Sequence, residues 1–154
     1  MDEIDDVPRR LWQLPSWLLN RAAREATAVV GDAFARAGVR RHHFTVLLTL
    51  AEYGPASQAS LGRRLGIDRS DMAAVVGDLE RDALIARARD ANDRRRNVVT
   101  LTPAGETTLQ TLDARVEAAQ DELLAPLTTM ERDELTRLLT RLVAGRDGQP
   151  PARV

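Results

Sequence analysis

The stretch Leu61–Leu101 constrains the fold more than any other part of the 154-residue chain. Apolar residues at helical spacing predict a short helix, Leu61–Leu65, and a second helix from Arg69 to about Arg81, with a tight turn between them. Two alternating segments, Leu84–Arg89 and Asn97–Leu101, then predict a β-hairpin around a polar loop. Helix, turn, helix and hairpin in this order form a winged helix-turn-helix, whose second helix fits the major groove of DNA.

The predicted second helix has two distinct faces. Gly66 can adopt the positive φ that ends the first helix, and Asp68 is a good N-cap for the second. The expected buried face consists of Met72, Val75, Val76 and Leu79. The other face carries small and polar residues, as a groove-docking surface requires: Arg69, Ser70, Asp71, Ala73, Ala74 and Asp78. The same pattern also suits an ordinary surface helix of a bundle, so this helix alone leaves both interpretations open.

The loop of the hairpin, residues 90–97, favours the DNA interpretation. Arg94, Arg95 and Arg96 are adjacent and repel one another, so the isolated protein gains nothing from them. A nearby polyanion removes this cost, because guanidinium groups pair with phosphates and enter narrow, electronegative minor grooves. Asp93 can hydrogen-bond one arginine and hold its plane. The alternative is a solvated turn that happens to be charged.

These motifs resemble those of the MarR family of bacterial transcription regulators (multiple antibiotic resistance regulators). The matching segments are Leu61–Ile67, Asp78–Arg81, Asp93–Asn97 and Leu101–Gly105. The Asp-x-Arg pattern followed by Leu-Thr-x-x-Gly is specific in this context, and the likeness extends over nearly the whole chain. The resemblance implies that Asp93 and Arg95 form the wing pair, with Arg95 in the minor groove. It also implies that Arg69, Ser70 and Asp71 begin the recognition helix.

The chain departs from the family pattern at two positions. Family members usually have glycine where Ala83 stands, and we expect Asp82 to take the turn conformation instead. Asp71 places a carboxylate, which phosphate repels, at the groove surface. This carboxylate is tolerable there if it accepts a hydrogen bond from cytosine or orients Arg69.

Composition fits one compact domain, with 44% hydrophobic and 29% charged residues. Cysteine is absent, which excludes disulfides, thiolate metal sites and thiol redox sensing. No apolar run approaches a membrane span, and the start MDEIDDVPRR is acidic where a signal peptide would be basic. We therefore expect a cytoplasmic protein without a membrane partner.

A net charge of -1 does not exclude DNA binding, because the charge is unevenly distributed. The stretch from Arg81 to Arg96 has six arginines against three aspartates, whereas Glu106–Glu134 has eight acidic residues against two arginines. Screening over about 8–10 Å at physiological salt lets these regions act separately. The basic tip can therefore meet phosphate while the acidic scaffold points away.

The sequence carries no motif of an enzyme. It lacks a phosphate-cradling glycine loop, a nucleophile elbow and a His-Glu-x-x-His zinc helix. His42 and His43 are adjacent and point in different directions on a helix, so a metal site from this pair is not expected. We predict a protein that is not an enzyme, with no cofactor and no metal.

The helices outside the DNA-reading unit predict dimerisation. Ser16 is expected to cap a helix ending near Ala37, a second helix covers Arg41–Tyr53, and Ser57 caps the next. Thr102 caps a helix that starts at Pro103 and runs to about Leu124, and Thr129 begins a final helix, Glu131–Ala144. The apolar stripes of these helices are larger than a small core can cover, so we expect them to pair with a second copy. We expect a single domain, 1–154. It consists of dimerisation helices at 16–37 and 103–145, a winged helix-turn-helix at 41–102 and a flexible tail at 146–154. The resemblance implies a homodimer formed by the terminal helices, on a palindromic operator in double-stranded DNA.

An effector site is a further expectation from the resemblance, because members of the family commonly bind phenolic or other aromatic compounds beside the dimer helices. The candidate lining residues are Trp12, Trp17, His42, His43 and Phe44. The alternative is that Trp17 and Phe44 belong to the core and the histidines cap a helix or contact phosphate.

The sequence therefore predicts a mainly α protein with a small β-hairpin wing, acting as a sequence-specific transcriptional regulator, a repressor released by a small aromatic or phenolic effector. A non-specific DNA-coating or architectural protein without an effector is the alternative. The candidate DNA-binding residues are Ser57, Gln58, Arg69, Ser70, Asp71, Ala74, Arg87, Arg89, Asp93, Arg94, Arg95 and Arg96.

Overall fold

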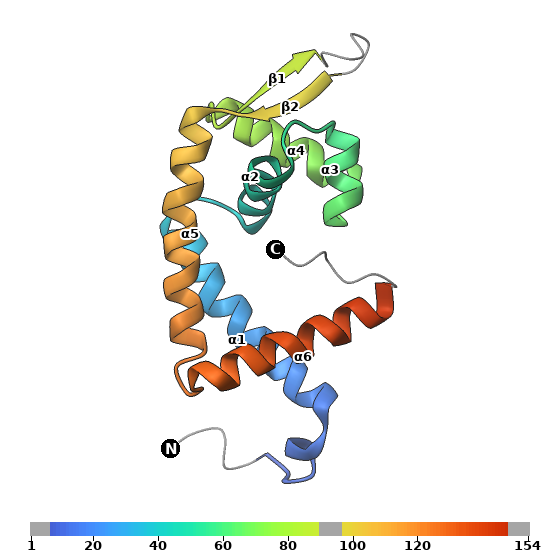
Figure 1. Ribbon diagram of the computed structural model, residues 1–154, viewed down its shortest axis with the longest axis vertical. Helices are drawn as coiled ribbons and strands as arrows, with labels where there is room; N and C mark the ends of the chain where they lie inside the picture. The colour runs from blue at the N-terminus through green and yellow to red at the C-terminus, as the bar shows by residue number, and fades with distance from the viewer. Residues whose placement is uncertain (1–6, 90–96, 148–154) are drawn as a thin grey trace.

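The computed structural model describes residues 7–89 and 97–147, and it confirms a mainly α fold with one β-hairpin (Figure 1). The described residues form η1 (Leu11–Gln13), α1 (Pro15–Arg36), α2 (Arg41–Tyr53), α3 (Gln58–Leu65), α4 (Arg69–Arg81), β1 (Ile85–Arg89), β2 (Asn97–Leu101), α5 (Pro103–Leu123) and α6 (Thr129–Asp147). The hairpin projects from one end of the molecule, beside α4, and α6 lies towards the opposite end of α5 (Figure 1).

Local capping chemistry determines the start and end of the helix-turn-helix. The Ser57 side chain accepts a hydrogen bond from the Ser60 N–H and caps α3. The helix itself begins at Gln58, three residues before the predicted Leu61. Gly66 has φ 64° and ends α3, as predicted. Asp68 then caps α4 by accepting from the N–H groups of Ser70 and Asp71. These caps fix the angle at which α4 leaves the turn.

One hydrophobic core lies beneath the DNA-reading unit. Met72, Val75, Val76 and Leu79 of α4 are buried, as predicted. They pack in the same cluster as residues of α1, α2, α3, both strands and α5: Phe34, Val46, Leu47, Leu50, Leu61, Ile85, Val99, Leu109 and Leu112. The long helices and the DNA-reading unit therefore share one core, which ties α4 to α1 and α5.

The hairpin is antiparallel, with Ile85 opposite Leu101 and Arg89 opposite Asn97. The inner end is anchored by the buried side chains of Ile85 and Val99. A further bridge joins Ala56, in the loop before α3, to Val99. The base of the wing is thus fixed to the start of the helix-turn-helix.

Two predicted helix boundaries are wrong. Ser16 does not cap the first helix: Leu14 is the N-cap and Pro15, with its fixed φ, occupies the first turn. The last helix begins at Thr129 and extends to Asp147, so residues 146 and 147 are helical rather than part of a tail. The predicted start at Thr129 is confirmed: Thr128 precedes this helix and exchanges hydrogen bonds with Glu131, a capping pattern that starts it.

The end of α4 also differs from the prediction. Ala83, not Asp82, takes the left-handed conformation, with φ 57°, whereas Asp82 has φ -81°. The N–H of Ala83 donates to Glu80 O and the N–H of Leu84 donates to Leu79 O, the two bonds of a Schellman motif. The chain must reverse at this residue for Leu84 to enter the hairpin, so alanine accepts a conformation that glycine prefers.

Replacing Ala83 by glycine is expected to raise the free energy of unfolding by about 1 kcal/mol, because the left-handed conformation costs an alanine about 1–2 kcal/mol. Urea denaturation followed by circular dichroism measures the change. Asp82→Gly is the matched control: its φ is negative, so glycine there should give no gain. A stabilisation by Asp82→Gly but not by Ala83→Gly would contradict this description of the turn.

Candidate nucleic-acid interface

The outer face of α4 is an exposed surface of small and polar residues. Arg69, Ser70, Asp71, Ala73 and Ala74 are all exposed, as predicted for a groove-docking face. Asp78, predicted on the same face, is instead half-buried, because its carboxylate is bonded to Arg40 and Arg81. The buried residues of α4 hold the opposite side of the same helix in the core. A helix fixed in this way can approach a major groove without repacking, because apart from Arg69 only short side chains stand between its backbone and the DNA.

The N-cap of α4 also orients a candidate base-contacting group. Asp68 Oδ1 accepts hydrogen bonds from the N–H groups of Ser70 at 2.8 Å and Asp71 at 2.9 Å, and from Ser70 Oγ at 2.7 Å. These bonds, led by that of the Asp71 N–H, hold the pKa of Asp68 below its usual value. Because the Ser70 hydroxyl proton is directed at Asp68, its oxygen is left to accept hydrogen bonds from a base or from water.

Asp71 does not orient Arg69 in this structure. No hydrogen bond or ion pair joins these two side chains, both of which lie among the described residues. Of the two roles predicted for the Asp71 carboxylate, accepting a hydrogen bond from cytosine stays a prediction.

A groove between α3 and α4 adds a second arginine, Arg63, to this surface. Its volume is about 510 Å³, and its lining includes Gln58, Arg63 and Arg69. The structure therefore brings together Gln58 and Arg69, which the sequence assigned to DNA separately. Arg63 was missed by the sequence prediction, although its position four residues after Ala59 places both on one face of α3.

Two of the predicted DNA-binding arginines of the wing, Arg87 and Arg89, lie among the described residues and have different environments. The Nε atom of Arg87 lies 2.9 Å from Glu80 Oε2, so Arg87 ties β1 to the last turn of α4 and part of its charge is compensated. Arg89 is exposed at the outer end of β1. Asp93, Arg94, Arg95 and Arg96 lie outside the described residues, and their wing contacts stay a prediction.

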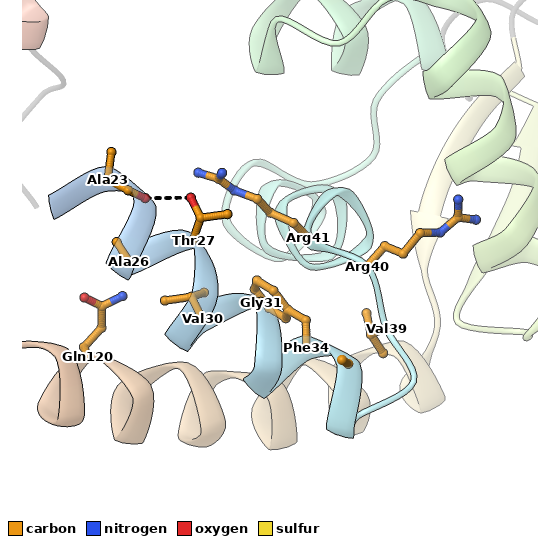
Figure 2. A pocket seen from close by; sticks show the side chains of 11 residues that line it. Ala23, Ala26, Thr27, Val30, Gly31, Phe34, Val39, Arg40, Arg41 and Gln120 are labelled. Carbon is orange, nitrogen blue, oxygen red and sulfur yellow. Dashed lines mark hydrogen bonds between the residues drawn. The ribbon is translucent and has the colours of Figure 1, made fainter. Parts of the chain in front are cut away.

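A cavity of about 650 Å³ lies between α1, the start of α2 and α5 (Figure 2). Its wall along α1 consists of small and apolar residues, with Thr27, Val30 and Phe34 among them. Three polar side chains complete the lining: Arg40, Arg41 and Gln120. The guanidinium group of Arg41 extends towards Thr27, across one side of the cavity, whereas that of Arg40 points away from α1 (Figure 2).

The five residues predicted to line an effector pocket do not gather at one place in this chain, and none of them lines this cavity. Trp12 and Trp17 pair with each other at the start of α1, with ring centroids 5.2 Å apart. Phe44 packs on Phe34, with centroids 5.4 Å apart. At 1.5 Å per residue, Trp17 and Phe34 are roughly 25 Å apart along α1.

His42 and His43 have different environments. His42 is exposed, whereas His43 is buried and its Nδ1 accepts a long hydrogen bond, 3.4 Å, from the Arg40 N–H. That bond places the proton of a neutral ring on Nε2, which lies 3.5 Å from Asp78 Oδ2 without forming a hydrogen bond. Burial, and then the charge of Arg40, lower the pKa of His43 below its usual value of 6.5. The ring is therefore kept neutral, in a capping position at the start of α2.

The lowered pKa of His43 should make the free energy of unfolding depend on pH. Above pH 6.5 both states hold a neutral ring; below it the unfolded chain takes up a proton before the folded one does, so stability is lost as pH falls towards the lowered folded-state pKa. Urea denaturation at pH 7.5 and 5.5 should show this loss in wild type and little of it in His43→Gln. His42→Gln is the exposed control and should retain the loss. An equal loss in wild type and His43→Gln would contradict the assignment.

Residues 7–89 and 97–147 lack two further features, a membrane-spanning helix and a metal-binding cluster. No helix there has both the length and the apolarity needed to cross a membrane. No three histidine or acidic side chains in the same ranges gather closely enough to hold a metal ion.

Comparison with known proteins places these features in a family. A sequence model described as the MarR family matches residues 37–96, which include α2, α3, α4 and β1. The chain is 33% identical over 117 residues to a proposed transcriptional regulatory protein for the hcr operon of Thauera aromatica, covering 76% of this chain and 70% of that protein. It is 28% identical over 127 residues to the homoprotocatechuate degradative operon repressor of Escherichia coli, covering 79% and 83% of the two chains.

The fold is shared with solved structures. One is that of BpsR from Bordetella bronchiseptica, whose DNA binding is regulated by 6-hydroxynicotinic acid. The two chains are 25% identical, with a TM-score of 0.74, over 84% of this chain and 93% of that one.

Proposed function

Because the chain belongs to the MarR family of transcriptional regulators, we propose that it is a sequence-specific repressor that binds double-stranded DNA as a homodimer and releases it on binding a small aromatic acid. Members of this family are DNA-binding transcription factors and not enzymes, as the sequence predicted. The observation that carries the proposal is the exposed face of α4, which is small, polar and fixed to the core.

The proposed contacts follow the arrangement of the surface. Arg69, Ser70 and Ala74 face the bases of the major groove, and the Ser70 oxygen accepts from an amino group of adenine or cytosine. Gln58 and Arg63, at the groove between α3 and α4, contact the phosphate backbone, together with Ser57 at the start of α3. On the sequence evidence, Arg94, Arg95 and Arg96 hold the wing on the minor groove and its phosphates.

The proposed dimer is supported by exposed apolar side chains on the terminal helices. Leu14, Leu18 and Leu19 are exposed near the start of α1, and Leu142 and Val143 are exposed near the end of α6. A water-facing cluster of this kind at both ends of a chain favours pairing with a second copy. Two-fold symmetry would then place two copies of α4 about 34 Å apart, one turn of DNA, as a palindromic operator requires.

The proposed effector site is the cavity between α1, α2 and α5. It has an apolar wall for a ring, with Arg41 available for a carboxylate and Gln120 for a hydroxyl or ring nitrogen. Regulation of the similar BpsR by 6-hydroxynicotinic acid supports this chemistry. We propose a small aromatic carboxylate as the class of effector.

Selection of bound fragments from a random DNA library tests the proposal. A specific dimeric repressor should enrich one inverted repeat with half-site centres about 10 base pairs apart. Enrichment of a single half-site would contradict the dimer but not the specificity. No enriched sequence, together with binding to every fragment, would instead indicate a DNA-coating protein.

A further inference from the structure

We infer that Arg40 is the residue through which the cavity controls the recognition helix: it forms part of the cavity wall and also holds Asp78 of α4. This inference rests on the proposed function, because it assigns a route by which an effector in the cavity weakens DNA binding. Arg40 contacts neither DNA nor the outer face of α4 in this route; it is a positioning residue.

The first half of the route is the segment between α1 and α2. Val39, Arg40 and Arg41 are consecutive, and all three line the cavity. Figure 2 shows the chain passing from α1 to α2 beside the cavity, with the side chains of Arg40 and Arg41 diverging from it. An occupant large enough to fill the space against α1 therefore meets this segment, and the position of Arg40 depends on the occupant.

The second half of the route is Asp78, on α4. Its Oδ2 accepts a hydrogen bond from the guanidinium group of Arg40, and its Oδ1 accepts one from Arg81 at 2.9 Å. The buried ring of His43 lies 3.5 Å from Oδ2. The Asp78 side chain is only 18% exposed, so it is held more rigidly than the carboxylate of an ordinary surface ion pair.

Arg40 alone joins these two halves among the described residues. His43 contacts Asp78 but does not line the cavity, and Arg81 contacts Asp78 from within α4 itself. Arg41 lines the cavity but extends towards α1 rather than α4 (Figure 2). A displacement of the cavity wall is therefore transmitted to α4 by the Arg40–Asp78 pair, because Asp78 lies on the same helix as the base-contacting residues.

Coupling of this kind has a thermodynamic requirement. A ligand shifts α4 only if it binds more tightly to the arrangement in which the Arg40–Asp78 pair is altered. Without the Arg40–Asp78 pair, a ligand in the cavity should not change the affinity of α4 for DNA. The coupling factor, rather than either affinity, is thus the quantity that depends on Arg40.

The absence of cysteine from the chain permits a test that needs no natural effector. Thr27 is exposed and lines the cavity, so Thr27→Cys supplies a single thiol there. Its thiolate displaces bromide from 4-(bromomethyl)benzoic acid and forms a thioether, which places an aromatic carboxylate beneath Arg41. Ala26→Cys, also in the lining, is a second attachment point if the first variant folds poorly.

The readout is the ratio of DNA affinities before and after alkylation, measured on the operator enriched from the random library. We expect alkylation to weaken binding about 10-fold in the parent, within the usual range of allosteric coupling. In the Arg40→Gln background the ratio should fall to about 2 or less, because the ion pair between the cavity wall and Asp78 is lost. Arg81→Gln is the matched control, with an equally exposed side chain on the same carboxylate (71% against 67% for Arg40), and should keep the parental ratio.

The possible failures are distinguishable. An unchanged ratio in Arg40→Gln would overturn the route while leaving the repressor and its effector site in place. Equal loss of coupling in Arg40→Gln and Arg81→Gln would also overturn it, because the charge state of Asp78 rather than the cavity wall would then matter. If alkylation has no effect in the parent, the cavity does not control DNA binding. Failure of the unmodified variant to prefer the operator over random DNA would contradict the proposed function itself.

Discussion

Replacing Gly105 by alanine is expected to lower the free energy of unfolding by about 3 kcal/mol, at the upper end of the usual cost of overpacking. A Cβ atom at this position would lie 2.1 Å from the carbonyl oxygen of Leu84 and 2.7 Å from Leu101 Cδ1. The Leu84 oxygen cannot move freely, since it accepts hydrogen bonds from the N–H and the hydroxyl of Thr102. The added methyl group must therefore separate α5 from the base of the hairpin.

Urea denaturation measures this loss, and Gly77→Ala provides the control. Gly77 is a helical glycine of α4 whose added Cβ meets no atom within 4 Å. Alanine there should raise the free energy of unfolding by about 0.5–1 kcal/mol, the usual helix preference of alanine over glycine. A Gly105→Ala protein as stable as wild type would show that α5 does not pack so closely on the hairpin.

The second large effect concerns the outer face of α4. Ala74→Glu is expected to weaken operator binding at least about 100-fold, or about 2.7 kcal/mol, because it places bulk and negative charge against the DNA. Ala74 is exposed and glutamate is a good helix former, so the free energy of unfolding should change little. Gel-shift titration with the operator, together with urea denaturation, separates the two effects.

Ala114→Glu is the matched control for this experiment. It adds the same group to an exposed position of α5, a helix that does not belong to the proposed DNA surface. Operator binding should therefore stay within about 3-fold of wild type, as expected for a distant rim charge under salt screening. Equal losses in the two variants would mean that α4 has no special role and that added negative charge alone weakens binding.

Features set by local chemistry were predictable from the sequence. The caps at Ser57, Asp68 and Thr102 need only a side-chain oxygen and the N–H groups two or three residues later. The left-handed residue Gly66 follows from the same kind of local rule. The buried face of α4 follows from helical periodicity, which a single long stripe of apolar residues makes clear.

Features that depend on where distant elements meet were not predictable. Ala83 is left-handed because Leu84 must turn into β1, and no residue near it signals this. Leu48 lies at helical spacing from Phe44, which predicts a place in the core, but it is 38% exposed, since periodicity gives the centre of a buried face and not its width. Arg87 pairs with Glu80, seven residues earlier, across the turn between α4 and β1.

The cavity shows the same limit most clearly. The sequence prediction selected aromatic and histidine residues because they are rare and chemically distinctive. The structure instead forms the cavity from small residues of α1, whose short side chains leave space where α1 faces the start of α2 and α5. Small residues in a helix carry no sequence signal of the cavity that they create. Arg40 and Arg41 can be assigned to the cavity only when the relative positions of α1 and α2 are known.

If α4 and its surroundings read a DNA sequence, the protein binds one DNA far more tightly than random DNA, and competition binding measures this preference. Fluorescence anisotropy would follow wild-type protein on labelled DNA from immediately upstream of its own gene, with unlabelled random DNA as competitor, across a salt series. A specific repressor should prefer the upstream DNA by a factor of about 1,000 or more. Its affinity should also fall linearly with salt on logarithmic axes, as phosphate contacts release counterions. Equal affinity for the two DNAs, or no binding even at the lowest salt, would contradict the account.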